Sequence, residues 1–143
     1  MKNGILTFKS ISEDQQVISS LLSFARPLTS APTLSQYLRE LMDSKGLTAP
    51  DVYHRAWLDR QVFNKIIQYK DPKRASKRTL MQIVIGVLAT EQEAMTLLAT
   101  CGYAFELTSA EDQAFLFCIK SSLYSMYQVY EAQGILEKKA QCE

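Results

Sequence analysis

Apolar residues recur at helical spacing along most of the chain, and no segment shows the strict alternation typical of a strand. The clearest stripe joins five residues at spacing i, i+3, i+4, i+7 and i+8, namely Leu34, Tyr37, Leu38, Leu41 and Met42. Similar stripes predict further helices at about 12–25, 48–55, 59–68, 76–88, 90–101 and 109–130, with a break near 121–122. The pattern therefore predicts an all-α fold with a five-helix core and extra N- and C-terminal helices.

Residues that suit helix ends stand between these stripes. Hydroxyl or acidic residues suited to an N-cap precede each helix, at Ser12, Thr33, Thr48, Asp59, Ser76, Thr90 and Ser109. Gly46 and Gly102 suit helix C-termini, and Pro27 ends the first helix. We expect an N-terminal helical arm and linker at 1–32, a helical domain at 33–132, and a frayed polar tail at 133–143.

Composition narrows the class of protein. The chain has 143 residues, of which 47% are apolar and 22% charged, as in a soluble globular domain. No stretch reaches the ~20 apolar residues of a membrane span, and no targeting signal is evident. The sequence predicts a cytoplasmic protein without a membrane partner.

Catalytic and metal-binding chemistry finds little support in the sequence. The three cysteines lack CxxC spacing, and His54 is the single histidine, so neither zinc nor any other cofactor is expected. No glycine-rich phosphate loop occurs. We read His54 as a structural residue and expect no enzymatic activity.

Charge is concentrated in one segment, although the net charge is only +1. Residues 60–78 contain seven basic residues and one acidic residue, which gives +6, whereas the rest of the chain carries −5. Such an asymmetry indicates a surface that binds phosphate. A basic but merely solvated loop is the alternative interpretation.

Residues 48–68 show the pattern of a helix-turn-helix, which is a short helix, a tight turn and a second helix with an exposed polar face. Val52, Ala56 and Leu58 would pack inward, together with Val62, Phe63 and Ile66 in the second helix. The outward residues have the side chains that read base edges, and they are Arg60, Gln61, Asn64, Lys65 and Gln68. Phosphate contacts are predicted for Lys70, Lys73, Arg74, Lys77 and Arg78.

These residues resemble the helix-turn-helix domains of phage repressors and xenobiotic-response-element proteins. The similar features lie between Leu34 and Leu98, and they are Lys45-Gly46-Leu47-Thr48, Val52, Leu58, Asn64, Ile66, Leu80, Ile83, Val87 and Leu88. The resemblance implies that the helix at 59–68 enters the major groove of double-stranded DNA. It also implies a bacterial or phage transcription regulator.

A narrower resemblance extends from about Tyr37 to Ala132. It is to the helical domain often found C-terminal to bacterial macro domains, through Leu47–Asp51, Tyr53-x-Arg55-Ala56, Leu58-Asp59-Arg60-x-x-Phe63-x-Lys65-Ile66, Ser76-Lys77-x-Thr79, Leu97-Leu98 and Gly102-Tyr103-Ala104-Phe105. Only about 33 residues precede this region, so we expect no macro domain here and carry over no ADP-ribose function.

Three positions differ from the repressor pattern. Ala49 stands where the family has Gln, Tyr53 where it has a small residue, and Trp57 where its turn has Gly. They favour an alternative function, a helical protein-interaction module that keeps the fold without reading DNA. Its basic segment would then bind an acidic protein partner.

Aromatic residues gather near the C-terminus, where seven of the fourteen lie between Tyr103 and Tyr130. Core packing is one explanation. The other is a partner surface made by Tyr124, Tyr127 and Tyr130, whose rings combine an apolar body with a polar tip. Since helix-turn-helix proteins commonly dimerise, we predict a homodimer through this region.

Overall fold

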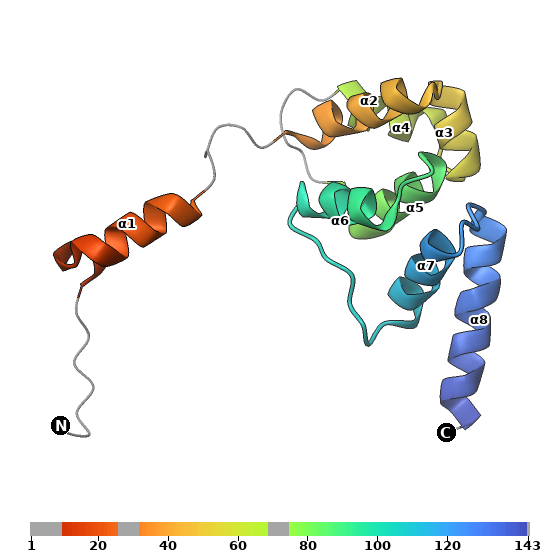
Figure 1. Ribbon diagram of the computed structural model, residues 1–143. Helices are drawn as coiled ribbons and strands as arrows, with labels where there is room; N and C mark the ends of the chain where they lie inside the picture. Colours follow the sequence, from red (N-terminus) through yellow and green to blue (C-terminus); the bar gives the residue numbers. More distant parts are fainter. Residues whose placement is uncertain (1–9, 26–31, 69–74, 143) are drawn as a thin grey trace. The chain divides into compact units, whose positions relative to one another are not determined.

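The computed structural model describes residues 10–25, 32–68 and 75–142 (Figure 1). These residues form eight α-helices and one 3-10 helix, with no strand among them, so the fold is all-α as predicted. The chain divides into two units, 1–31 and 32–143, which are described separately.

The first unit contains a 3-10 helix, Ile11–Glu13, followed by α1, Gln15–Phe24. The cap of α1 is Asp14, whose carboxylate accepts hydrogen bonds from the backbone N–H groups of Gln16 and Val17. The prediction of Ser12 as the cap is therefore wrong, because the 3-10 turn occupies that position. α1 buries none of its residues, and all of its apolar side chains except that of the half-buried Ile18 are exposed.

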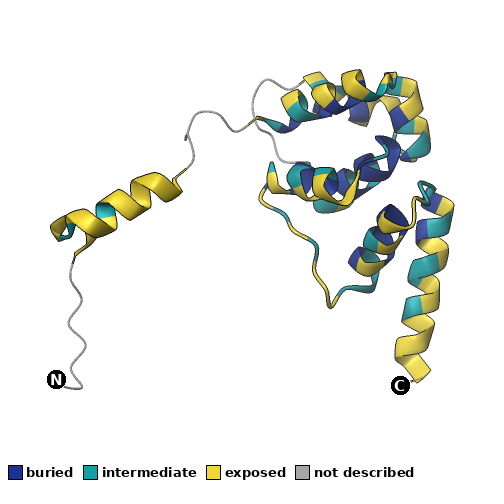
Figure 2. Cartoon of the chain, viewed as in Figure 1, coloured by how far each residue is buried: buried dark blue, intermediate teal, exposed yellow. Residues whose placement is uncertain are grey.

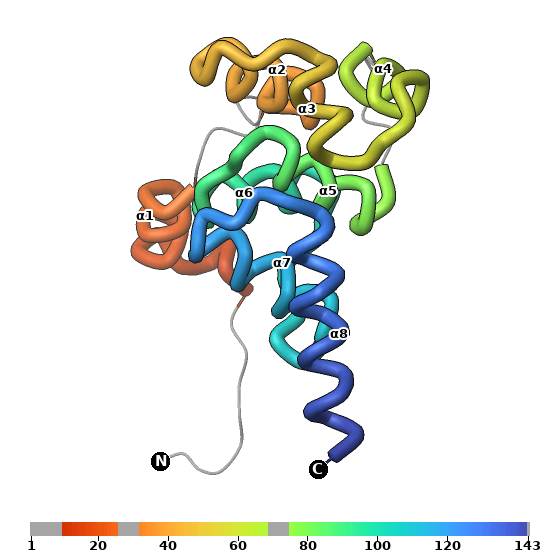
Figure 3. Tube along the Cα trace, turned by 90° about the vertical axis from the view of Figure 1, so that its right-hand side faces the viewer, coloured from red at the N-terminus to blue at the C-terminus, as the bar shows by residue number. Residues whose placement is uncertain are grey.

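The second unit contains the other seven helices. They are α2 (Leu34–Lys45), α3 (Ala49–Arg55), α4 (Arg60–Gln68), α5 (Lys77–Gly86), α6 (Glu91–Ala99), α7 (Ala110–Lys120) and α8 (Met126–Cys142). Figures 1 and 3 show α2, α3 and α4 on one side of α5 and α6, with the antiparallel pair α7 and α8 on the other side. Among the described residues, no helix combines the length and apolar character that a membrane span requires.

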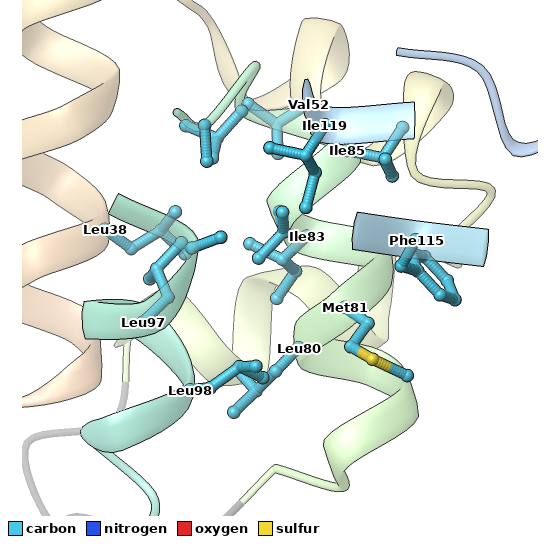
Figure 4. Packing of buried hydrophobic residues seen from close by; sticks show 14 of the residues in the cluster. Leu38, Val52, Leu80, Met81, Ile83, Ile85, Leu97, Leu98, Phe115 and Ile119 are labelled. Atoms are coloured by element: carbon cyan, nitrogen blue, oxygen red, sulfur yellow. The ribbon is translucent and has the colours of Figure 1, made fainter. Parts of the chain in front are cut away.

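Helix α5 is the centre of the core. Six of its ten residues are buried, and they are Leu80, Met81, Ile83, Val84, Ile85 and Gly86. A helix that is apolar on nearly every side must be surrounded by other helices. Figure 4 shows Leu38 of α2 and Leu97 of α6 near Ile83, with Phe115 of α7 near Met81. α5 thus joins the two outer layers into one hydrophobic core.

The predicted helix caps are confirmed at most positions. Thr33, Thr48 and Thr90 each form a capping box with the residue three positions later. The hydroxyls of Ser76 and Ser109 accept hydrogen bonds from the N–H groups of Thr79 and Asp112. Each bond satisfies one of the free N–H groups at a helix start. Because the cap and its partner lie only three positions apart, the sequence predicts these helix boundaries.

The C-terminal segment differs from its prediction. We expected a frayed tail from residue 133, but α8 is helical as far as Cys142. Ala132 and Leu136 continue its apolar stripe against the core, and this packing extends the helix beyond the interruption at Gly134. The outer face of its C-terminal half is exposed (Figure 2).

Candidate nucleic-acid interface

The predicted helix-turn-helix corresponds to α3, the turn at 56–59 and α4. Val52 and Ala56 are fully buried, as predicted, and Leu58 packs against the core. Hydrogen bonds to the backbone and side chain of Thr48 lower the pKa of Asp51, whose carboxylate completes the capping box at the start of α3. The backbone between the helices turns at Trp57, whose φ is 58°.

Helix α5 holds this turn by close backbone contact. A Cβ atom on Gly86 would lie only 2.4 Å from the carbonyl oxygen of Val52, so α3 and α5 meet where a side chain has no room. The Arg55 guanidinium donates a hydrogen bond to the Gly86 carbonyl at 2.6 Å, and the Gln82 amide donates to the Ala56 carbonyl at 2.9 Å. Both bonds fix the C-terminal end of α3 and the start of the turn.

Helix α4 is held at both of its ends. The carboxylate of Asp59 accepts a hydrogen bond from the N–H of Gln61 at 2.9 Å. At the other end, the carbonyl of Ile67 accepts from the Ser35 hydroxyl at 2.6 Å and from the Arg39 guanidinium at 2.7 Å. Sequence reasoning missed Ser35 and Arg39, because a contact across about 30 positions leaves no local pattern. α2 therefore orients α4.

The outer face of α4 is polar. Phe63 and Ile66 are buried on its inner face, as predicted. Five polar residues share the opposite face: Arg60, Gln61, Lys65 and Gln68 are exposed, and Asn64 is half-buried. No ion pair or side-chain hydrogen bond within the described part of the chain engages these five side chains. Val62 is 43% exposed, so the prediction that it packs inward is wrong, because it lies at the border between the two faces.

Two of the residues predicted to contact phosphate, Lys77 and Arg78, form ion pairs within the chain. Lys77 binds the buried carboxylate of Asp112 at 2.6 Å and lies 3.7 Å from Glu106, while Arg78 pairs with Glu111. Because α7 supplies Asp112 and Glu111, these pairs fasten α7 to the N-terminus of α5. The other three predicted phosphate contacts, Lys70, Lys73 and Arg74, lie outside the described residues.

The three tyrosines predicted as a partner surface separate in the structure. The Tyr124 hydroxyl donates to the Ala89 carbonyl at 2.7 Å and its ring packs on the core. Tyr130 lies 5.7 Å from Trp57 between ring centroids and beneath the Arg78 guanidinium at 5.3 Å. Only Tyr127 extends freely, at 66% exposure. α8 therefore contacts the turn between α3 and α4 at Trp57.

The remaining chemistry-bearing residues are dispersed. His54 is exposed and stands edge-on to Tyr53 at 4.6 Å between ring centroids. Cys101 and Cys118 are buried, and burial raises the pKa of the Cys118 thiol. Across residues 10–25, 32–68 and 75–142, no three His, Cys, Asp or Glu side chains gather as a metal site would require.

No protein-family model matches this sequence, and no curated protein and no solved structure gives a significant match. The resemblance to repressor domains therefore stays a prediction.

Proposed function

We propose that this protein is a helix-turn-helix DNA-binding regulator that places α4 in the major groove. The observation that carries the proposal is the outer face of α4. Its Arg, Gln, Asn and Lys side chains belong to the types that form hydrogen bonds with base edges, and no described residue engages them. Because α4 is held at both ends, it is also suited to keeping these side chains in a fixed orientation.

The basic residues of this proposal differ in whether they pair with acids of the same chain. Lys77 and Arg78 pair with acids of α7, and these acids compete with phosphate for both side chains. Arg60 and Lys65 are exposed and remain the best-supported charged contacts among the described residues. We still assign phosphate contacts to Lys70, Lys73 and Arg74 on the strength of sequence.

A titration of labelled duplex DNA at low and at moderate salt tests the proposal. We expect binding that weakens steeply with salt, because phosphate neutralisation releases counterions. Arg60→Ala with Lys65→Ala, and separately Lys73→Ala with Arg74→Ala, should each weaken binding and flatten the salt dependence by about one to two contacts. Lys120→Ala with Lys139→Ala removes the same charge from α7 and α8 and should leave that slope unchanged.

The ion pairs at the start of α5 favour a second candidate. If Lys77 and Arg78 serve the fold, and Ala49, Tyr53 and Trp57 alter the repressor pattern, the domain is a helical protein-interaction module with an acidic partner. Absence of duplex binding even at low salt would contradict DNA binding and favour this module. Equal loss of binding in the α4 variant and the α7–α8 control would show that the attraction is non-specific.

A further inference from the structure

The exposed face of α8 has a symmetric order of residues. Six positions at helical spacing form this face, and they are Tyr127, Glu131, Gly134, Ile135, Lys138 and Cys142. All six are exposed, whereas Met126 and Val129 on the opposite face are buried. We call these six residues the outer face of α8.

Two features of this face are unusual for a surface that only meets water. Ile135 is 64% exposed, and an apolar groove beside it is lined by Phe117 of α7, itself 57% exposed, and by Ala132 and Leu136. Gly134 stands next to Ile135 in the interior of a helix, where glycine costs about 1 kcal/mol relative to alanine. No atom lies within 4 Å of the position a Cβ would occupy there, so packing within the chain does not require glycine.

Charge complementarity indicates what covers this face. In an antiparallel pair of α8 helices centred between residues 134 and 135, Glu131 of each copy lies opposite Lys138 of the other. The same register places Ile135 of each copy against Gly134 of the other, where the missing side chain leaves room. One surface thus supplies both halves of each contact, as an isologous interface requires.

We propose that the protein forms a two-fold symmetric homodimer through antiparallel pairing of the outer face of α8. Ile135 of each copy fills the notch at Gly134 of its partner, and two Glu131–Lys138 ion pairs flank this centre. The predicted tyrosine interface is thereby replaced, except that Tyr127 lies at the end of the new one. This proposal does not depend on DNA binding.

Solution mass, measured across the micromolar range, tests the dimer. Wild-type protein should be dimeric, and Glu131→Lys or Lys138→Glu alone should raise the dissociation constant about tenfold by placing like charges together. The double variant Glu131→Lys with Lys138→Glu should recover dimerisation, since it exchanges both charges. A monomeric wild type, or a double variant no better than either single one, would overturn the proposal.

The notch is tested by Gly134→Gln. This exposed change favours the helix of the monomer, so unfolding does not explain its effect. It should raise the dissociation constant about tenfold, because the added side chain blocks Ile135 of the partner. If Gly134→Gln has the same dissociation constant as the wild type, the proposed close approach of the two helices at Gly134 is overturned.

Cysteine cross-linking tests the antiparallel register. The two Cys142 residues of such a dimer lie about 22 Å apart along the helix axis, too far for a disulfide, whereas each lies opposite Tyr127 of the other copy. Tyr127→Cys should therefore give an intermolecular disulfide on mild oxidation, and Tyr127→Cys with Cys142→Ser should not. A Cys142–Cys142 disulfide in the wild-type dimer, or no cross-link in Tyr127→Cys, would overturn the register.

Discussion

The basic segment at 60–78 has two described parts, 60–68 and 75–78, whose charged side chains differ in their partners. On α4, Arg60 and Lys65 are exposed and contact no acid among the described residues. At the start of α5, Lys77 and Arg78 are paired with Asp112, Glu106 and Glu111. The difference shows that basic residues clustered in sequence can have different partners, because acids distant in sequence reach only some of them.

The largest expected effect belongs to Asp112→Ala. Asp112 is 3% exposed and accepts hydrogen bonds from Lys77 and from the N–H of Glu106. Removing it leaves that N–H without its acceptor and leaves Lys77 with only the more distant and exposed carboxylate of Glu106, so we expect a loss of about 3 kcal/mol in the free energy of unfolding. Urea denaturation measures this loss.

Glu111→Ala is the matched control for that change. Its partner Arg78 is more exposed to water, so the loss should be below about 1 kcal/mol. Equal losses in the two variants would show that burial of Asp112 does not set the strength of the α5–α7 connection.

Gly86→Ala should have the next largest effect. The added methyl group meets the Val52 carbonyl, which forces α3 away from α5 and should cost about 2 kcal/mol. Lys77 and Arg78 lie at the other end of α5, so their ion pairs should persist while α4 is displaced. Calorimetry measures the loss of stability, and an unchanged melting temperature would contradict the close packing of α3 and α5.

Substitution of Trp57 should give a smaller difference in stability, in which glycine is more favourable than alanine. Its φ of 58° is unfavourable for a side chain, so Trp57→Gly should exceed Trp57→Ala in stability by about 1 kcal/mol. Both variants lose the contact with Tyr130, and their difference isolates the backbone. Equal stability of the two, measured by chemical denaturation, would argue against the left-handed turn.

Lys65→Ala should have the smallest effect on stability, within about 0.5 kcal/mol, since this side chain has no described partner. In the same variant, DNA affinity should fall if α4 binds DNA. A stability loss as large as that of Asp112→Ala would mean that the two parts of the basic segment share one structural role.

Local patterns predicted the helices well, and distant contacts explain the errors. The predictions of Thr48 and Ser76 as N-caps were correct, because a cap depends on residues only three positions away. The engagement of Lys77 was not predictable, because Asp112 lies 35 positions later and is brought near only by the packing of α7 on α5. The contact of Arg39 in α2 with the end of α4 was not predictable either, because the two residues lie 28 positions apart. The polar face of α4 was largely predictable from spacing, because Phe63 and Ile66 mark the inner face, but spacing misplaced Val62.

The turn at Trp57 has a spectroscopic consequence. Trp57 is the single tryptophan of the chain, and it contacts Tyr130 of α8 while remaining 55% exposed. Its fluorescence therefore reports on one place where α8 meets the turn before α4. Release of α8 from this turn would change the emission without any label.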